Sequence, residues 1–277
     1  MVESASLERM CAERHRRFES CSLCQKKERM SFSLESTKKE YNEKSVLETY
    51  KEYAEYGLWK SEKCVIKKYF NKADKILDIG CGAGRTTIGL YEMGYKNIIG
   101  LDIAEGMIEV AKQLAKERKL PVEFVVGNAL ELPYEDNSFD RVLFSYNGIM
   151  CIPKVKNREK VLSEIYRVLK PGGIFVFTAH DNEDESSKKY EKVWAEEMAK
   201  WERGEQDPNL EVFGDIIAES GNEGKVFIHI STLSECKNFI ATQAFKILYT
   251  EMRRKIAKVP KYEENNFGEC RLFVVQK

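Results

Sequence analysis

Short apolar runs alternate along the chain with segments whose apolar residues recur at helical spacing. The apolar runs, each short enough for a buried strand, span 75–80, 97–103, 122–129, 141–147 and 174–180. Helices are predicted between them over 85–94, 104–119 and 157–170. Alternation of this kind makes right-handed βαβ units, which lie in a parallel sheet covered by helices on both faces.

Two segments that flank this alternating region are expected to be helical. Residues 41–70 carry aromatic and aliphatic residues at helical spacing and predict two helices with a break near Gly57. Residues 181–224 are highly charged and irregular, and we expect a helical insert there, packed over the edge of the sheet. The apolar residues at helical spacing in this insert are Val193, Trp194, Met198 and Trp201.

Apolar residues at strand and helix spacing occur again near the C-terminus. A strand is predicted over 225–230, a helix over 231–245, and two closing strands over 246–257 and 269–277. Ser231 or Thr232 can cap the helix, with Glu235 as the answering acid of a capping box.

The first 40 residues are polar, charged and weakly periodic. We interpret 1–40 as an appended N-terminal tail, in which Met30 is an alternative start, and 41–277 as one domain. Cys11, His15, Cys21 and Cys24 of this tail are all zinc-ligand types, and zinc favours tetrahedral sites of three cysteines and one histidine. The spacing matches no standard finger, so a tail that carries thiols without metal is the default interpretation.

Composition narrows the class of protein. Lys and Arg together number 45, as do Asp and Glu, so the formal net charge is zero, which argues against a protein that coats nucleic acid by bulk electrostatics. No apolar run approaches the roughly 18 residues needed to span a bilayer, and the N-terminus lacks the apolar segment of a signal peptide. Eight scattered cysteines then predict reduced thiols and a cytoplasmic location.

The first apolar run ends in three glycines separated by single residues. Gly80, Gly82 and Gly84 follow Asp78, an acid inside the run. A dinucleotide fingerprint would need its third glycine where Arg85 stands. A carboxylate would repel a pyrophosphate but attract an ammonium or a sulfonium. The loop therefore favours a cationic ligand over a dinucleotide.

Polar residues also end the next two runs. Asp102 lies 22 residues after Gly80, where an acid accepts the hydroxyls of a ribose, so it indicates a nucleoside without deciding which one. Asn128 and Ala129 end the third run, where an adenine could lie. Ligands of such sheets sit outside the carboxyl ends of the strands, and these loops converge there.

Four stretches together carry a family resemblance. They are "ILDIGCGAGR", "GLDIAEGMIEVAK", "GNALELPYEDNSFDRVLFSYN" and "REKVLSEIYRVLKPGG". In this order and spacing the chain resembles the class I S-adenosylmethionine-dependent methyltransferase family, in its UbiE or type 11-like branch, closely over about 45–180. The resemblance implies a Rossmann-like sheet of seven mostly parallel strands with helices on both faces. It also implies S-adenosylmethionine as the cofactor and S-adenosylhomocysteine as its product.

The resemblance also assigns residues to parts of the cofactor. The three glycines, with Cys81 as a small residue that fills the turn, would let the backbone approach the methionine part, and Asp78 would lie near its ammonium. Asp102 would accept from the ribose. The residues expected around adenine are Ile103, Met107, Asn128 and Ala129. Asn128 departs from the acid that is usual in the family, although an amide oxygen can accept the same hydrogen bond.

The end of the fourth run is expected beside the methyl group and the acceptor, at Ser145, Tyr146 and Asn147. A carboxylate or phenolate acceptor would need no base, whereas an amine or alcohol would be helped by His180, which is equally well explained as structural. Tyr146 is a second candidate catalytic residue. The aromatic residues at Tyr50, Tyr53, Tyr56 and Trp59 predict core or lid packing, or an aromatic lid for a sulfonium.

Three functions therefore stay open. The first is methyl transfer by in-line displacement to an unidentified acceptor, with a small molecule favoured over a nucleic acid. The second is a nucleic-acid or protein methyltransferase with a metal-binding N-terminal segment. The third is an NAD-dependent oxidoreductase, against which the glycine spacing and Asp78 both count.

Overall fold

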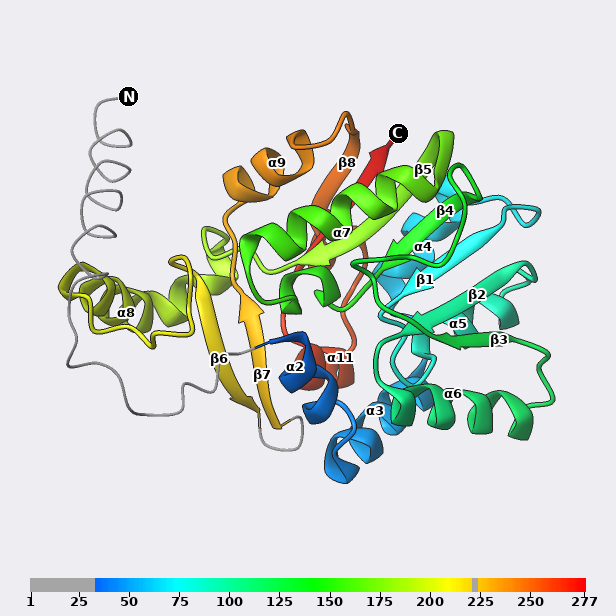
Figure 1. Cartoon of the computed structure of the whole chain (residues 1–277), viewed down its shortest axis with the longest axis horizontal. Helices are drawn as coiled ribbons and strands as arrows, with labels where there is room; N and C mark the ends of the chain where they lie inside the picture. The colour runs from blue at the N-terminus through cyan, green and yellow to red at the C-terminus, as the bar shows by residue number, and fades with distance from the viewer. Residues whose placement is uncertain (1–32, 221–223) are drawn as a thin grey trace. The chain divides into compact units, whose positions relative to one another are not determined.

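A twisted seven-stranded sheet organises the chain (Figure 1). The computed structural model describes residues 33–220 and 224–277. Along the sheet the strand order is β3-β2-β1-β4-β5-β9-β8. The strands are β1 (Ile76–Ile79), β2 (Ile98–Asp102), β3 (Glu123–Val126), β4 (Phe139–Phe144), β5 (Leu169–Ala179), β8 (Lys246–Met252) and β9 (Arg271–Gln276). The first five pair in parallel, and β9 runs antiparallel to both β5 and β8. The expected fold class is thereby confirmed.

Helices cover both faces of this sheet because neighbouring strand residues point to opposite faces. In β1, Leu77 packs with the cluster that includes Leu162 and Ile240, whereas Ile76 packs with the cluster that includes Ile66 and Leu90. These partners lie on α7 (Val155–Val168) and α9 (Leu233–Ala241) on one face, and on α4 (Lys60–Tyr69) and α5 (Arg85–Glu92) on the other (Figure 1). Further helices before β5 include α3 (Lys44–Tyr56), α6 (Glu105–Glu117) and the short η2 (Gly148–Cys151). The two helices predicted around Gly57 are thus present, as is the Thr232 capping box of α9.

The insert contains a strand that the sequence pattern did not predict. After the short helix η3 (Glu185–Tyr190) and α8 (Glu191–Arg203), β6 (Asp215–Ser220) pairs antiparallel with β7 (Gly224–His229). These two strands form a separate sheet. The strand predicted over 225–230 therefore exists but does not join the main sheet, because its partner is the neighbouring β6.

Two more expectations near the C-terminus need correction. The strand predicted over 246–257 ends at Met252, and the next residues form α10 (Arg253–Ile256). The segment before β9 holds α11 (Lys261–Phe267), which was not predicted. Its sequence is charged, and Phe267 is one of its two buried residues, so no amphipathic period reveals it.

The last part of the expected tail is a capped helix. In α2 (Leu34–Glu40), Ser33 and Ser36 form a capping box. The helix is held to α6 by the ion pair between Lys38 and Glu105, whose N–O distance is 2.6 Å, and to β7 by Glu40, which accepts from the Lys225 amide at 2.6 Å. The candidate zinc ligands Cys11, His15, Cys21 and Cys24, and the alternative start Met30, lie outside the described residues.

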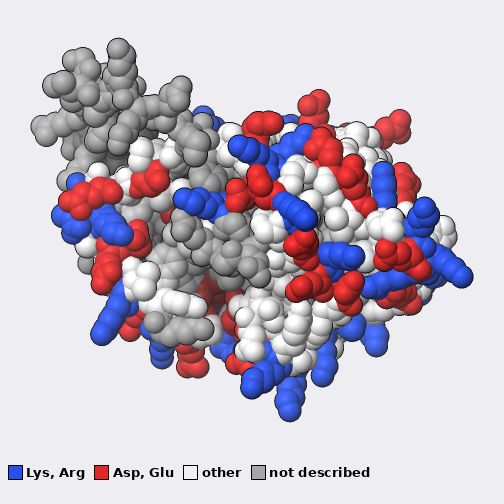
Figure 2. Space-filling model, turned by 90° about the horizontal axis from the view of Figure 1, so that it is seen from below, with Lys and Arg blue, Asp and Glu red and all other residues white. Residues whose placement is uncertain are grey.

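Lys and Arg are interspersed with Asp and Glu on the face that Figure 2 shows, as expected from the balanced composition. Within 33–220 and 224–277, no helix combines the length and apolar character needed to cross a membrane.

Candidate active site

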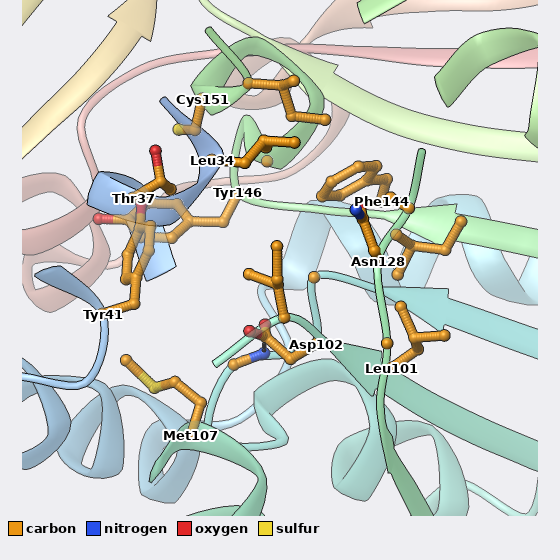
Figure 3. Close-up of a pocket in the computed structure, with 18 of the residues that line it drawn as sticks. Leu34, Thr37, Tyr41, Leu101, Asp102, Met107, Asn128, Phe144, Tyr146 and Cys151 are labelled. Carbon is orange, nitrogen blue, oxygen red and sulfur yellow. Dashed lines mark hydrogen bonds between the residues drawn. The ribbon is translucent and has the colours of Figure 1, made fainter. Parts of the chain in front are cut away.

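A pocket opens where the carboxyl ends of β1 to β4 meet (Figure 3). It encloses about 780 Å³ of empty space, including its open mouth. The predicted residues that line it are Gly80, Gly82, Asp102, Ile103, Met107, Asn128, Ala129, Ser145 and Tyr146. Asp78, Cys81, Gly84 and His180 are not among the lining residues. The convergence of loops expected at this edge of the sheet is therefore observed.

Backbone conformation explains the glycines of the loop. Gly80, Gly82 and Gly84 all have positive φ, at 61°, 53° and 90°, which residues with a side chain rarely adopt. A Cβ on Gly80 would also overlap the ring of Phe144. Between them, Cys81 is buried and its pKa is raised well above the usual value by burial, so its thiol fills the turn and is not activated as a nucleophile.

Asp78 lies behind the loop with one oxygen unsatisfied. Its Oδ2 accepts from the hydroxyls of Thr86 and Thr87, the latter at 2.6 Å, whereas Oδ1 is buried and has no partner among the described residues. Burial raises the pKa of Asp78 to about 7, although both threonine hydroxyls act in the opposite direction. A buried carboxyl with a free oxygen beside a glycine loop fits a cationic group such as an ammonium.

We expect Asp78→Asn to stabilise the protein without ligand at pH 8 by at least about 1 kcal/mol while weakening cofactor binding. The pKa of the folded protein lies above the value of about 4 in the unfolded chain. Wild-type stability is therefore lost as the pH rises through 7, and the amide removes this loss. Urea unfolding at pH 5 and pH 8 measures the effect, with exposed Asp136→Asn as the control. Equal stability of Asp78→Asn and wild type at pH 8 would contradict it.

Asp102 holds the loop and faces the pocket at once. Its Oδ2 accepts from the Gly82 amide at 2.8 Å and its Oδ1 from the Ala104 amide at 2.9 Å. Each carboxylate oxygen has two lone pairs, so both can still accept from a ribose hydroxyl. Burial raises the pKa of Asp102, and the backbone hydrogen bonds partly offset this rise.

The side chain of Asn128 forms a hydrogen bond within its own turn. Its Oδ1 accepts from the Leu130 amide at 2.9 Å, which shapes the turn after β3. This contact uses one lone pair of Oδ1 and none of the Nδ2 donors, so the amide can still hydrogen-bond an adenine. The expected role of Asn128 stays a prediction.

A buried ion pair lies directly behind Ser145 and was not predicted from sequence. Arg85, the first residue of α5, donates to both oxygens of Glu62 on α4, at 2.8 and 2.7 Å, and its guanidinium lies 4.6 Å from the centre of the Trp59 ring. The Ser145 hydroxyl donates to Glu62 and accepts from Arg85 at 3.1 Å. Burial acts to raise the pKa of Glu62, but the Arg85 charge and the hydrogen bonds lower it below its usual value. The network joins a helix before the sheet, the glycine-loop helix and the end of β4.

His180 does not occupy the position of a general base. Its Nδ1 donates to the Glu269 carbonyl at 2.8 Å, which leaves Nε2 to accept from the Asn147 amide group at 3.0 Å. Burial lowers the pKa of His180, so the imidazole is neutral at pH 7 with both nitrogens engaged. His180 thus positions Asn147 and does not reach the pocket.

Tyr146, the other catalytic candidate, does line the pocket. Tyr146 and Asn147 have consecutive positive φ values of 53° and 58°, a costly conformation for residues with side chains that is concentrated at functional sites. The predicted aromatic lid is also present in part. Tyr50 faces the pocket, whereas Tyr53 and Trp59 pack with Phe267 behind Tyr146.

Sequence reasoning missed the wall of the pocket opposite the glycine loop. Its residues are Leu34, Thr37 and Tyr41 around α2, and Cys151 and Ile152 at η2. The polar composition of 34–40 concealed this wall, and the pair of serines that caps α2 was the available signal.

The strand order, the glycine loop, Asp78 within β1 and Asp102 at the end of β2 define a class I methyltransferase fold. Residues 77–177 match a family model described as a methyltransferase domain. The predicted resemblance to S-adenosylmethionine-dependent enzymes of the type 11 branch is confirmed, and the unpartnered Asp78 oxygen and the open glycine loop fit this cofactor.

Individual relatives agree with this assignment. The chain is 37% identical over 126 residues to a demethylmenaquinone methyltransferase of Symbiobacterium thermophilum, which covers 43% of this chain and 49% of the relative. It is 36% identical over 159 residues to one of Lactococcus lactis, covering 55% and 60%. The chain thus spans about half the length of the curated relatives it matches.

Solved structures show the same fold. A protein of Methanosarcina mazei described as an S-adenosylmethionine-dependent methyltransferase superposes with a TM-score of 0.62 at 25% identity, covering 80% of this chain and 98% of that one. A protein of Pyrococcus horikoshii superposes with a TM-score of 0.57 at 24% identity, covering 78% and 87%.

Proposed function

We propose that this chain is an S-adenosylmethionine-dependent methyltransferase that acts on a small-molecule acceptor. The observation that carries the proposal is the pocket formed by the glycine loop and Asp102 in a domain of the methyltransferase family. The names of the two bacterial relatives support an acceptor of small-molecule type. A domain that begins at the helices before β1, and a cytoplasmic location, stay predictions.

The chain's own residues would bind and orient the reactants. When bound, the cofactor supplies a methyl group on a positively charged sulfur, which the acceptor takes with loss of a proton or of its own negative charge. The glycine loop and Asp102 would hold the cofactor, and Tyr146 with Tyr50 would exclude water. Alignment of this kind supplies several kcal/mol of the barrier.

The described pocket offers no residue placed as a general base. Among its described lining residues Asp102 carries the only formal charge, and its oxygens hold the loop. We therefore infer that the acceptor needs no base from the pocket and loses its own acidic proton to solvent, as a phenol, a thiol or an acidic carbon can.

Calorimetric titration of the full chain tests the proposal. We expect saturable binding of S-adenosylmethionine and S-adenosylhomocysteine with one site per chain, and no binding of NAD. Binding of NAD in place of both would establish the oxidoreductase alternative. Zinc content of the purified chain and salt-dependent filter binding of nucleic acid test the remaining alternative.

A further inference from the structure

The pocket has two ends of different chemistry. The residues assigned to the cofactor gather around Asp102 and Met107, whereas Leu34, Thr37 and Cys151 gather at the opposite end (Figure 3). The cofactor end belongs to the region that matches the family model, but α2, which supplies Leu34 and Thr37, lies outside residues 77–177. The second end is therefore built partly from a segment that precedes the matched region.

This second end is apolar and carries no formal charge among its described residues. Leu34, Leu130 and Ile152 supply aliphatic surface, and the absence of a side chain at Gly148 lets the Phe144 ring pack directly against it. A charged acceptor would lose its hydration here without gaining a counter-charge, which costs several kcal/mol. The chemistry of this end thus favours an uncharged, largely apolar acceptor.

Thr37 is the polar exception. Its Oγ1 is enclosed and has no hydrogen-bond partner among the described residues. A threonine hydroxyl in a helix ordinarily donates to the carbonyl four residues earlier. Here that carbonyl, of Ser33, already accepts from the Thr37 amide at 3.0 Å and from the Ser36 hydroxyl at 2.8 Å. An enclosed hydroxyl without a partner is costly and requires an explanation.

The position of Thr37 is set from both sides of the pocket. Lys38 pairs with Glu105 at the start of α6, and Asn42 accepts from the Gly106 amide at 2.7 Å. Glu40 accepts from the Lys225 amide on β7. Because α2 is held at these points, the backbone that carries Thr37 has a fixed position at the pocket.

We propose that Thr37 is a specificity-determining residue of an acceptor subsite between α2 and η2, and that its hydroxyl hydrogen-bonds the polar group of an uncharged, largely apolar ring compound. This inference rests on the proposed function, because it takes the other end of the pocket as the cofactor site. A hydroxyl both donates and accepts, so a phenol or a ring carbonyl would satisfy it.

Three ring probes and the full chain saturated with S-adenosylhomocysteine test this subsite. The probes are 1-naphthol, 1-methylnaphthalene, which lacks the hydroxyl, and 1-naphthoate, which carries a charge. Affinities are measured by ligand-observed NMR for wild type, Thr37→Val and Thr37→Ser. Thr242→Val is the matched control, since that exposed hydroxyl follows α9, does not line the pocket and donates to the Phe239 carbonyl at 2.7 Å.

We expect Thr37→Val to weaken 1-naphthol about tenfold and to leave 1-methylnaphthalene within twofold, with affinity restored in Thr37→Ser and unchanged in Thr242→Val. We expect 1-naphthoate to bind wild type at least tenfold more weakly than 1-naphthol. Equal effects of Thr37→Val on both neutral probes, tight binding of 1-naphthoate, or no binding of either neutral probe would overturn the subsite. Failure of S-adenosylhomocysteine itself to bind would instead overturn the proposed function.

Discussion

Asp102→Ala is expected to weaken binding of S-adenosylmethionine by about 100-fold to 10,000-fold. Two hydrogen bonds from ribose hydroxyls to a carboxylate are lost, each worth about 1.5–3 kcal/mol. The substitution also frees the Gly82 and Ala104 amides, so the loop that faces the cofactor loses its tie to β2. Isothermal titration calorimetry of the full chain measures the loss.

A matched control separates binding from stability. Asp140, at the start of β4, accepts from the Lys75 amide at 2.9 Å and from the Lys170 ammonium at 2.8 Å, and so makes similar contacts at the opposite edge of the sheet. Asp140→Ala is expected to lower stability while leaving cofactor affinity within threefold. Asp102→Asn keeps one acceptor oxygen and should give an intermediate affinity. Near-wild-type affinity of Asp102→Ala would show that the ribose lies elsewhere.

The central strands could be predicted because burial on both faces makes each of them a continuous apolar run. Strand β6 has no such run, because it pairs only with β7, outside the main sheet. Its own sequence does not show which segment it pairs with. Helix α11 is similar, because Phe267 is recognisable as a core residue only once Tyr53 and Trp59 are in place around it. The sequence pattern therefore did not predict the elements that depend on contacts between distant segments.

In the candidate site, too, some residues could be predicted from the local sequence and others could not. The glycine loop and Asp102 can be recognised from the local sequence. A turn that requires positive φ favours glycine, and Asp102 stands at the end of a recognisable apolar run. The pairing of Glu62 with Arg85 joins residues 23 positions apart on two helices, and each charge alone resembles a surface residue. Thr37 lies in a polar segment whose role depends on the fold around it. Cofactor chemistry was therefore predictable, and the acceptor wall was not.

Arg85→Met is expected to lower the free energy of unfolding by about 3–5 kcal/mol at pH 8, because it leaves the buried Glu62 carboxylate without its counter-charge. Chemical denaturation measures the change. Exposed Arg118→Met, which breaks the pair with Glu92 at 3.0 Å, is the control and should cost less than about 1 kcal/mol.

The pH dependence distinguishes lost charge pairing from lost packing. In wild type the lowered pKa of Glu62 gives stability that is present above the unfolded value of about 4.5 and lost as the pH falls through the folded value. Without Arg85, burial raises the pKa of Glu62, so the variant loses stability as the pH rises and its deficit should widen from pH 5 to pH 8. Glu62→Gln combined with Arg85→Met removes both charges and should recover at least half of the deficit. A deficit that is independent of pH and unrelieved in the double variant would mean that Arg85 acts through its packing on Trp59 alone.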